Sequence, residues 1–203
     1  MSDFGKLAPD ATIKKTIAAL AKNGISSEAV KTKEEARQKV LSMIPKGAEV
    51  MTMSSVSLEE TGITEAINES GEYDSVKKKL FSMDRKTSGR QMQKLGAAPE
   101  FALGSVHAVT EDGSLLIASN TGSQLGAYAY SSAKVIWVVG TQKIVTNVDE
   151  GMKRLHEYVV PKEDIHMHEL YGVGTNVSKL LIFNKEIVPN RVHVVFVNEP
   201  LGF

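Results

Sequence analysis

The chain has 203 residues, of which 42% are hydrophobic and 24% charged, proportions typical of a globular protein with a sizeable core. Lys plus Arg and Asp plus Glu each number 24, so no excess positive charge indicates binding to nucleic acid or to an anionic membrane. Because cysteine is absent, the chain itself offers no disulfide, thiolate-held iron–sulfur cluster or cysteine nucleophile, and no cofactor is evident.

Neither a membrane span nor a secretion signal is recognisable. No apolar run approaches the roughly 18–20 residues of a transmembrane helix. The N-terminal segment MSDFGKLAPDATIKK has no apolar signal-peptide core. We therefore expect a soluble cytoplasmic protein, and the lack of repeats and linkers predicts one domain over residues 1–203.

The first third of the chain is predicted to be mainly helical. A helix is expected to begin at Asp10, because apolar residues recur at helical spacing after it, and Gly24 is positioned to end it. Thr32 is expected to cap a second helix, with Glu35 at the position that completes a capping box. Residues 1–46 are therefore predicted to form an N-terminal helical portion.

The rest of the chain alternates between strand-like and helix-like segments. Residues 48–55 and 133–140 are apolar runs typical of buried strands, and residues 101–119 alternate around an Asp-Gly pair, a strong hairpin signal. The last long helix is expected to end before Pro161. Helices are expected at residues 57–71, 74–96 and 147–161, and a further strand at residues 190–200. This alternation predicts an α/β fold with helices on both faces of a mostly parallel sheet.

The segment NTGSQLGA, residues 120–127, is a candidate anion-binding loop between a strand and a helix. Backbone N–H groups at the start of a helix lack intrahelical partners and bind phosphate or carboxylate. Asn120, Thr121, Gly122 and Ser123 are therefore candidate ligand-binding residues. The alternative is an ordinary connection in which Ser or Thr caps the helix, and the segment matches neither a Walker loop nor a G-x-G-x-x-G fingerprint.

A second hydroxyl-rich segment, MTMSSVSLEETG, follows the predicted strand at residues 48–55. Ligands of open α/β sheets bind beyond the carboxyl ends of strands, so Ser54, Ser55 and Ser57 are candidate ligand contacts. The alternative for Ser57 is helix capping, with Glu60 at the capping-box position.

Two charged residues are further candidates. Glu111 is a weak candidate for a catalytic carboxylate, against the alternative that it belongs to a hairpin turn. Lys143 follows a buried strand and either meets an anion or is a solvated loop lysine. If helical, Lys79, Lys86 and Arg90 share a face and can help to hold an anionic substrate, although such runs are usually solvated.

The five histidines give no metal-binding pattern. Only His166 and His168 are close in the sequence, without a carboxylate or third histidine at a recognisable ligand spacing, so we expect no metal site. His107 and His193 lie in strand-like runs and are interpreted as structural side chains.

The order and spacing of these segments resemble the LUD-domain family, the LutC/YkgG-like lactate-utilisation proteins. The elements that carry the resemblance read HAVTEDG, NTGSQ, WVVGTQKIV and MKRLHEYVVP. SSVSLEETGI and the terminal NRVHVVFVNEPLGF are also similar to family segments, so the resemblance covers residues 10–203. Two features depart from the family pattern: residues 163–190 lack the cysteine-rich stretch of many short members, and His107 and Gln142 replace asparagines.

The resemblance implies a Rossmann-like sheet similar to that of the NagB/RpiA/CoA-transferase superfamily, whose members bind sugar phosphates or acyl-CoA at strand ends. It also implies an accessory role in the utilisation of L-lactate or a related organic acid, with iron–sulfur partner proteins that oxidise lactate to pyruvate. The alternative is an enzyme or sensor that binds an anionic metabolite, sugar phosphate or CoA-type ligand at the strand ends. Either protein can be a homo-oligomer.

Overall fold

The computed structural model of the chain describes residues 3–203, and within them six strands form an all-parallel sheet in the order β1-β10-β7-β4-β2-β3. These strands are β1 (Ser26–Val30), β2 (Glu49–Thr52), β3 (Asp74–Ser75), β4 (Phe101–Gly104), β7 (Lys134–Gly140) and β10 (Val192–Val197). Strand β7 is the apolar run at residues 133–140 expected to be buried, β10 is the further strand expected at residues 190–200, and both are almost entirely buried. The predicted α/β fold with a mostly parallel, Rossmann-like sheet is confirmed.

A second, mixed sheet was not predicted as a separate unit. Its strands have the order β8-β5-β6-β9 and are β5 (Ala108–Thr110), β6 (Leu115–Ser119), β8 (Ile144–Val145) and β9 (Lys179–Phe183). The expected hairpin joins β5 and β6, which pair antiparallel on either side of Asp112 and Gly113. Gly113 has φ +89°, a left-handed conformation that favours glycine in a tight turn.

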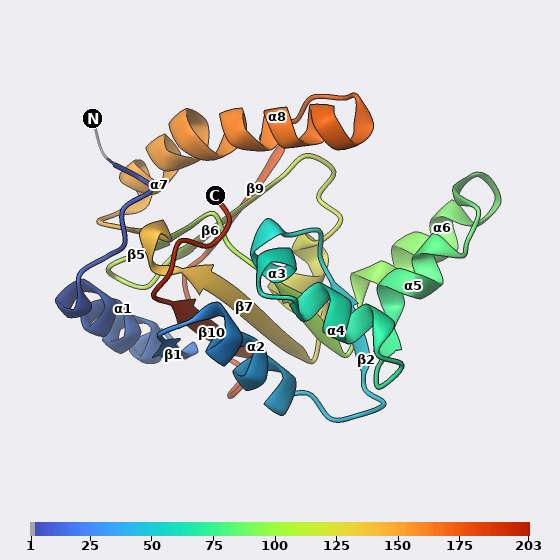
Figure 1. Ribbon diagram of the computed structural model, residues 1–203, viewed down its shortest axis with the longest axis horizontal. Helices are drawn as coiled ribbons and strands as arrows, with labels where there is room; N and C mark the ends of the chain where they lie inside the picture. Colours follow the sequence, from blue (N-terminus) through green and yellow to red (C-terminus); the bar gives the residue numbers. More distant parts are fainter. Residues whose placement is uncertain (1–2) are drawn as a thin grey trace.

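Different layers cover the two faces of the main sheet. One face packs against α2 (Lys33–Ser42), α3 (Val56–Glu60) and α4 (Ile63–Glu69), which lie in front of the strands in Figure 1. The other face packs against α1 (Asp10–Lys22) and the second sheet, where Trp137 meets Phe183 edge to face. The second sheet therefore takes part of the place expected for helices.

The helix α8 (Val160–Tyr171) corrects one prediction. The helix expected to end before Pro161 does not end there. It continues from α7 (Val148–Arg154) through a π-helical turn, Leu155–Val159, into α8. A proline is tolerated in the first turn of a helix because its missing N–H would have no partner there. As a result α8 crosses the top of the molecule in Figure 1, above the ends of several strands.

The N-terminal portion and the basic segment also differ from expectation. Residues 1–46 are not wholly helical, because β1 pairs in parallel with β10 at the edge of the main sheet. Its sequence, SSEAV, lacks an apolar strand pattern, and the strand is only half-buried. The single helix expected at residues 74–96 is instead strand β3 followed by two helices, α5 (Val76–Phe81) and α6 (Arg85–Ala97), which project from one side of the molecule in Figure 1.

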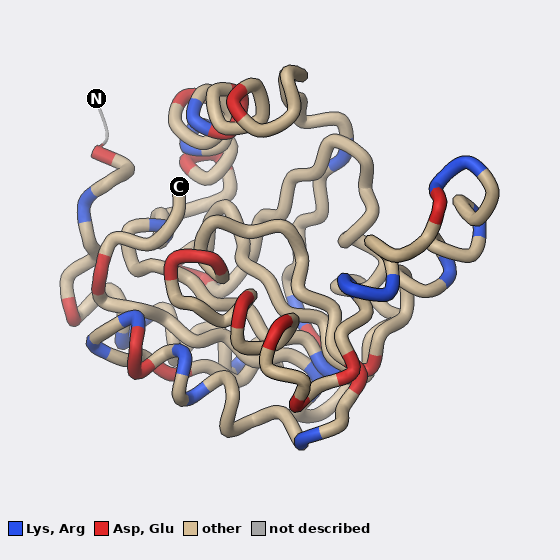
Figure 2. Tube along the Cα trace, turned by 45° about the vertical axis from the view of Figure 1, so that its right-hand side comes forward, with Lys and Arg blue, Asp and Glu red and all other residues tan. Residues whose placement is uncertain are grey.

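Charges of both signs are distributed along the chain. Figure 2 shows Lys and Arg positions interspersed with Asp and Glu over the trace. Among the helices of residues 3–203, none is both long and apolar enough to cross a bilayer.

Candidate functional site

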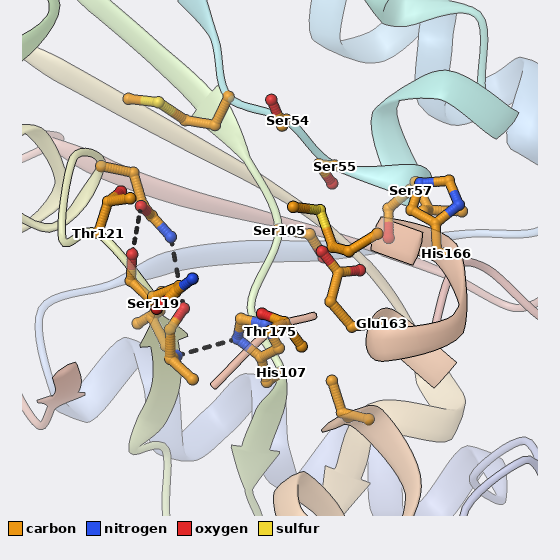
Figure 3. A pocket seen from close by; sticks show the side chains of 18 of the residues that line it. Ser54, Ser55, Ser57, Ser105, His107, Ser119, Thr121, Glu163, His166 and Thr175 are labelled. Carbon is orange, nitrogen blue, oxygen red and sulfur yellow. Dashed lines mark hydrogen bonds between the residues drawn. The ribbon is translucent and has the colours of Figure 1, made fainter. Parts of the chain in front are cut away.

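A cavity of about 430 Å³ lies at the carboxyl ends of β2, β4 and β7, three adjacent strands of the main sheet. Parallel α/β sheets characteristically bind ligands beyond these strand ends. The segment after β2 contributes Ser54, Ser55 and Ser57, and the segment after β4 contributes Ser105 and His107. The opposite walls come from β6, the loop after it, and α8 (Figure 3).

Lys143 is buried at this cavity. It ends the short 3-10 turn Thr141–Lys143 that follows β7, and its side chain is 3% exposed. Its Nζ donates hydrogen bonds to Ser57 Oγ at 3.1 Å and to Ser105 Oγ at 3.2 Å. Among residues 3–203, no carboxylate oxygen lies within 4.0 Å of this nitrogen. The alternative of a solvated loop lysine is therefore wrong, and the amine has only neutral partners.

The surroundings of Lys143 disfavour its charged form. Burial, together with the nearby Arg154 guanidinium, lowers the pKa of Lys143 to about 7, and the Glu60 carboxylate opposes part of this change. The lysine is therefore a mixture of amine and ammonium near neutral pH. Such a pKa is characteristic of functional lysines, because an ordinary surface lysine stays protonated.

A second buried cation, Arg154, lies close enough to Lys143 to influence its pKa. Arg154 on α7 is fully buried, and its NH1 group donates a hydrogen bond to the carbonyl oxygen of His107. Its Nε and NH2 groups have no hydrogen-bond partner within residues 3–203. Two buried cationic side chains without a contacting carboxylate create a positive potential, which attracts anions into the cavity.

His107 presents a fixed hydrogen-bond donor. The backbone N–H of Ala118 on β6 donates to His107 Nδ1 at 3.1 Å, which places the proton of a neutral ring on Nε2. Burial, together with the nearby Lys143 and Arg154, lowers the pKa of His107 to about 3. His107 has the expected structural role, because its ring accepts a hydrogen bond from β6. The ring also lines the cavity (Figure 3).

Ser54, Ser55 and Ser57 line the same cavity, as Figure 3 shows. Ser55, not Ser57, occupies the N-cap position of α3, and no side chain forms a cap hydrogen bond there. Ser57 is buried inside α3 and accepts the hydrogen bond from Lys143. The capping alternative is therefore wrong for Ser57.

The loop after β6 forms part of the opposite wall. Asn120, Thr121 and Ser123 line the cavity, while Gly122 has φ +84° and forms the turn. Two backbone donors of this loop already have local partners: the N–H of Gly122 donates to Ser119 Oγ, at the end of β6, at 2.8 Å, and that of Ser123 to Thr121 Oγ1 at 3.3 Å. The following π-helical turn, Ala127–Ser131, is too short to offer a helix N-terminus. Ligand binding by this loop stays a prediction that rests on its side chains.

Two of the charged candidates lie elsewhere. Glu111 is not among the residues that line the cavity and forms an ion pair with Lys15 at 2.6 Å. Lys79 forms an ion pair with Asp74 at 2.5 Å, and Lys77 is the lysine of α5 that lines the cavity. Burial lowers the pKa of Lys77, and the Glu59 carboxylate opposes this.

Sequence reasoning missed the contribution of α8. Glu163 and His166 from this helix line the cavity, and in Figure 3 they lie on the same side of the view as Ser57. Burial raises the pKa of Glu163, against the opposite influence of His166. The spacing of three residues between them places both on one helical face, which was the available signal. Within residues 3–203, no three His, Asp or Glu side chains cluster as a metal site would require.

Comparison with known proteins agrees with this architecture. The sequence profile of the LUD domain matches residues 13–197. The chain belongs to the LUD-domain family. The fold of this LUD-domain protein is similar to the crystal structure of a DUF162 family protein from Deinococcus radiodurans, with 14% sequence identity and a TM-score of 0.59 over 95% of this chain and 100% of that chain. A comparison with curated protein sequences gave no match.

Proposed function

We propose that this LUD-domain protein binds a small organic anion, a carboxylate of the lactate and pyruvate type, in the cavity at the strand ends. The observation that carries the proposal is Lys143, a buried amine that faces a cavity and has no carboxylate partner among the described residues. An unpaired buried charge lowers the stability of the folded state by several kcal/mol, about as much as removing one partner of a buried ion pair. A ligand of opposite charge removes this cost. An organic anion bound beside Lys143 supplies that charge.

The remaining lining suits a small polar ligand. The hydroxyl groups of Ser54 and Ser55 supply hydrogen-bonding groups, and His107 Nε2 supplies a donor on a ring that stays neutral. The volume of about 430 Å³ lies at the small end of ligand cavities. The family name connects these proteins with lactate utilisation, and we propose that this member acts in the use of lactate or a related organic acid.

A ligand screen tests the proposal. Thermal unfolding of the purified protein is measured with L-lactate, pyruvate, phosphate, a sugar phosphate and CoA. A ligand at about 100 times its Kd stabilises the folded state by roughly 2.7 kcal/mol, so a selective rise in Tm is expected with a small carboxylate. The rise should vanish in Lys143→Met and persist in Lys153→Met, which removes an exposed lysine of α7. Stabilisation that persists in Lys143→Met would contradict the proposal.

A second candidate function is that of an accessory subunit that works with iron–sulfur proteins of lactate oxidation. Exposed apolar side chains on α8 and β9 favour it: Ile165, Leu170, Tyr171, Leu180 and Ile182. Coexpression with such a partner should then give a complex on size-exclusion chromatography. The complex should be lost with Ile182→Glu on β9 and kept with Lys143→Met, whereas separate elution of the wild-type proteins would exclude this function.

A further inference from the structure

The position of Lys143 allows more than attraction of an anion. Its Nζ is held by the hydroxyls of Ser57 and Ser105, two groups that accept and donate protons. The same nitrogen lies at the cavity wall, next to the neutral ring of His107. A lysine that is desolvated and close to another cation is the arrangement that activates amines as nucleophiles.

We propose that Lys143 forms a reversible imine with the carbonyl carbon of a 2-oxo carboxylate bound in the cavity. This inference rests on the proposed function, because the ligand must first occupy the cavity as an organic anion. It assigns a substrate class that carries a carbonyl group next to its carboxylate. Lys143 is then a nucleophile that contacts the reacting carbon.

The step balances without an oxidant or reductant. The lone pair of Nζ forms the N–C bond, and the electrons of the C=O double bond move to oxygen, giving a carbinolamine. The C–O bond then breaks as the C=N bond forms, and the oxygen leaves as water. The two protons that the amine nitrogen loses end on the oxygen that leaves as water, and the Ser57 and Ser105 hydroxyls, at 3.1 and 3.2 Å from Nζ, are placed to relay them.

The charged surroundings favour the reactive form of Lys143. The Arg154 guanidinium on α7 disfavours the charged form of Lys143, while the Glu60 carboxylate on α3 opposes this effect. With its pKa lowered to about 7 by burial and by Arg154, Lys143 contains roughly a thousandfold more free amine at neutral pH than a lysine with the ordinary pKa of 10.5. The adduct should therefore form on Lys143 ahead of surface lysines.

Two cavity groups are suited to the other parts of the ligand. His107 carries its proton on Nε2, and this N–H is suited to donate a hydrogen bond to the oxyanion that develops at the carbonyl. Lys77 lines the same cavity and supplies a cation for the carboxylate, together with the hydroxyls of Ser54 and Ser55. With these groups binding the carboxylate, the amine of Lys143 stays available to attack the neighbouring carbonyl carbon.

Borohydride trapping of the full chain tests the inference. The protein is incubated with pyruvate at about neutral pH, where Lys143 is about half free amine, and then treated with sodium borohydride. A single adduct is expected on the peptide that contains Lys143, with a mass gain of pyruvate less one water plus two hydrogens. Excess L-lactate, which carries a hydroxyl group in place of the ketone of pyruvate and forms no imine, should compete with pyruvate and reduce the adduct. Lys153→Met should trap like the wild type, and Lys143→Met should not trap.

The outcomes separate the two proposals. If calorimetry shows pyruvate and L-lactate binding but no adduct forms, the imine is excluded while the proposed function stands. If neither ligand binds and no adduct forms, both proposals fail. An adduct that persists in Lys143→Met, or that is spread evenly over surface lysines, would also exclude the inference. Lys143→Arg keeps the positive charge without an imine-forming amine, so it should retain L-lactate binding more closely than Lys143→Met and form no adduct.

Discussion

Two hydroxyl-rich segments face each other across the cavity, and they use their hydroxyls differently. In the loop after β6, Ser119 and Thr121 accept hydrogen bonds from the backbone of the loop itself. In the segment after β2, Ser57 accepts from the side chain of Lys143, which comes from the end of β7. The first arrangement stabilises a turn, whereas the second holds a buried amine at a cavity.

The comparison shows why serine, threonine and glycine patterns alone do not identify an anion site. A hydroxyl group or backbone N–H that already has a local partner contributes little to a ligand, because binding must replace that hydrogen bond. A buried cation without a carboxylate retains its requirement for an anion. Substitutions in the two segments should therefore have different effects on ligand affinity and on stability.

The largest effect is expected from Lys143→Met. Removing the amine should weaken binding of a small carboxylate about a hundredfold, since a hydrogen bond to a charged group contributes roughly 1.5–3 kcal/mol. The same variant should unfold at higher urea concentration, because the cost of a buried amine disappears. Isothermal titration calorimetry and urea unfolding measure the two effects. A variant that loses affinity only because it is unfolded would show no cooperative unfolding at higher urea concentration.

The pH dependence of stability should be the next largest effect. Burial holds the folded-state pKa of Lys143 at about 7, below the ordinary 10.5 of the unfolded chain. Below about 7 both states are protonated and the full cost of burying the charge is present. Between these values the unfolded state binds more protons, so stability rises with pH by up to about 1.4 kcal/mol per pH unit. Urea unfolding of Lys143→Met should lack this rise, and parallel profiles would contradict a depressed pKa.

In the loop after β6, substitution of Gly122 should lower the stability of the fold without changing ligand affinity. Gly122 has φ +84°, and a Cβ there would lie 2.5 Å from Lys179 Cδ. We expect Gly122→Ala to destabilise the fold by about 1–2 kcal/mol in urea unfolding. Gly126→Ala is the matched control, because its φ is −63° and nothing lies within 4 Å of the added carbon. Affinity lost in Gly122→Ala without loss of stability would assign the loop a direct role in binding.

Removing one of the two serine hydroxyls that contact Lys143 should lower ligand affinity moderately. Ser105→Ala leaves Ser57 as the remaining protein partner of the amine, so we expect ligand affinity to fall about fivefold, equivalent to about 1 kcal/mol. Calorimetry measures this change. A loss as large as that of Lys143→Met would mean that Ser105 itself holds the ligand.

The smallest effect is expected from Thr121→Ala on the opposite wall. The hydroxyl of Thr121 is part of the internal hydrogen bonds of the loop, so affinity should change less than about twofold. A tenfold loss in calorimetry would reverse the comparison between the two segments.

The sequence was sufficient for much of the fold. The apolar runs that became β7 and β10, and the Asp-Gly turn of the β5–β6 hairpin, follow from local patterns. The strand β1 was missed because SSEAV lies at a sheet edge and needs no apolar face of its own. The helix α8 was missed because the preceding π-helical turn carries the chain past Pro161, which a rule based on helix interiors does not anticipate.

The site depended more heavily on tertiary contacts. Ser54, Ser55, Ser57 and Lys143 were identifiable as polar residues after strands, and adjacent strand ends bring them to one cavity. The burial of Lys143 arises only when the segments after β2 and β4 close around the end of β7, which no local pattern encodes. The missed residues of α8, Glu163 and His166, depend on the position of that helix over the strands.

The protonation of Lys143 is the most direct test of the account. Nuclear magnetic resonance of the lysine side-chain nitrogens, assigned with Lys143→Met, follows this group through a pH titration without and with L-lactate. We predict a midpoint at about 7 in the free protein and a higher midpoint with L-lactate, because a bound carboxylate stabilises the ammonium form. An ordinary midpoint of about 10.5, unchanged by the ligand, would contradict the central role given to this lysine.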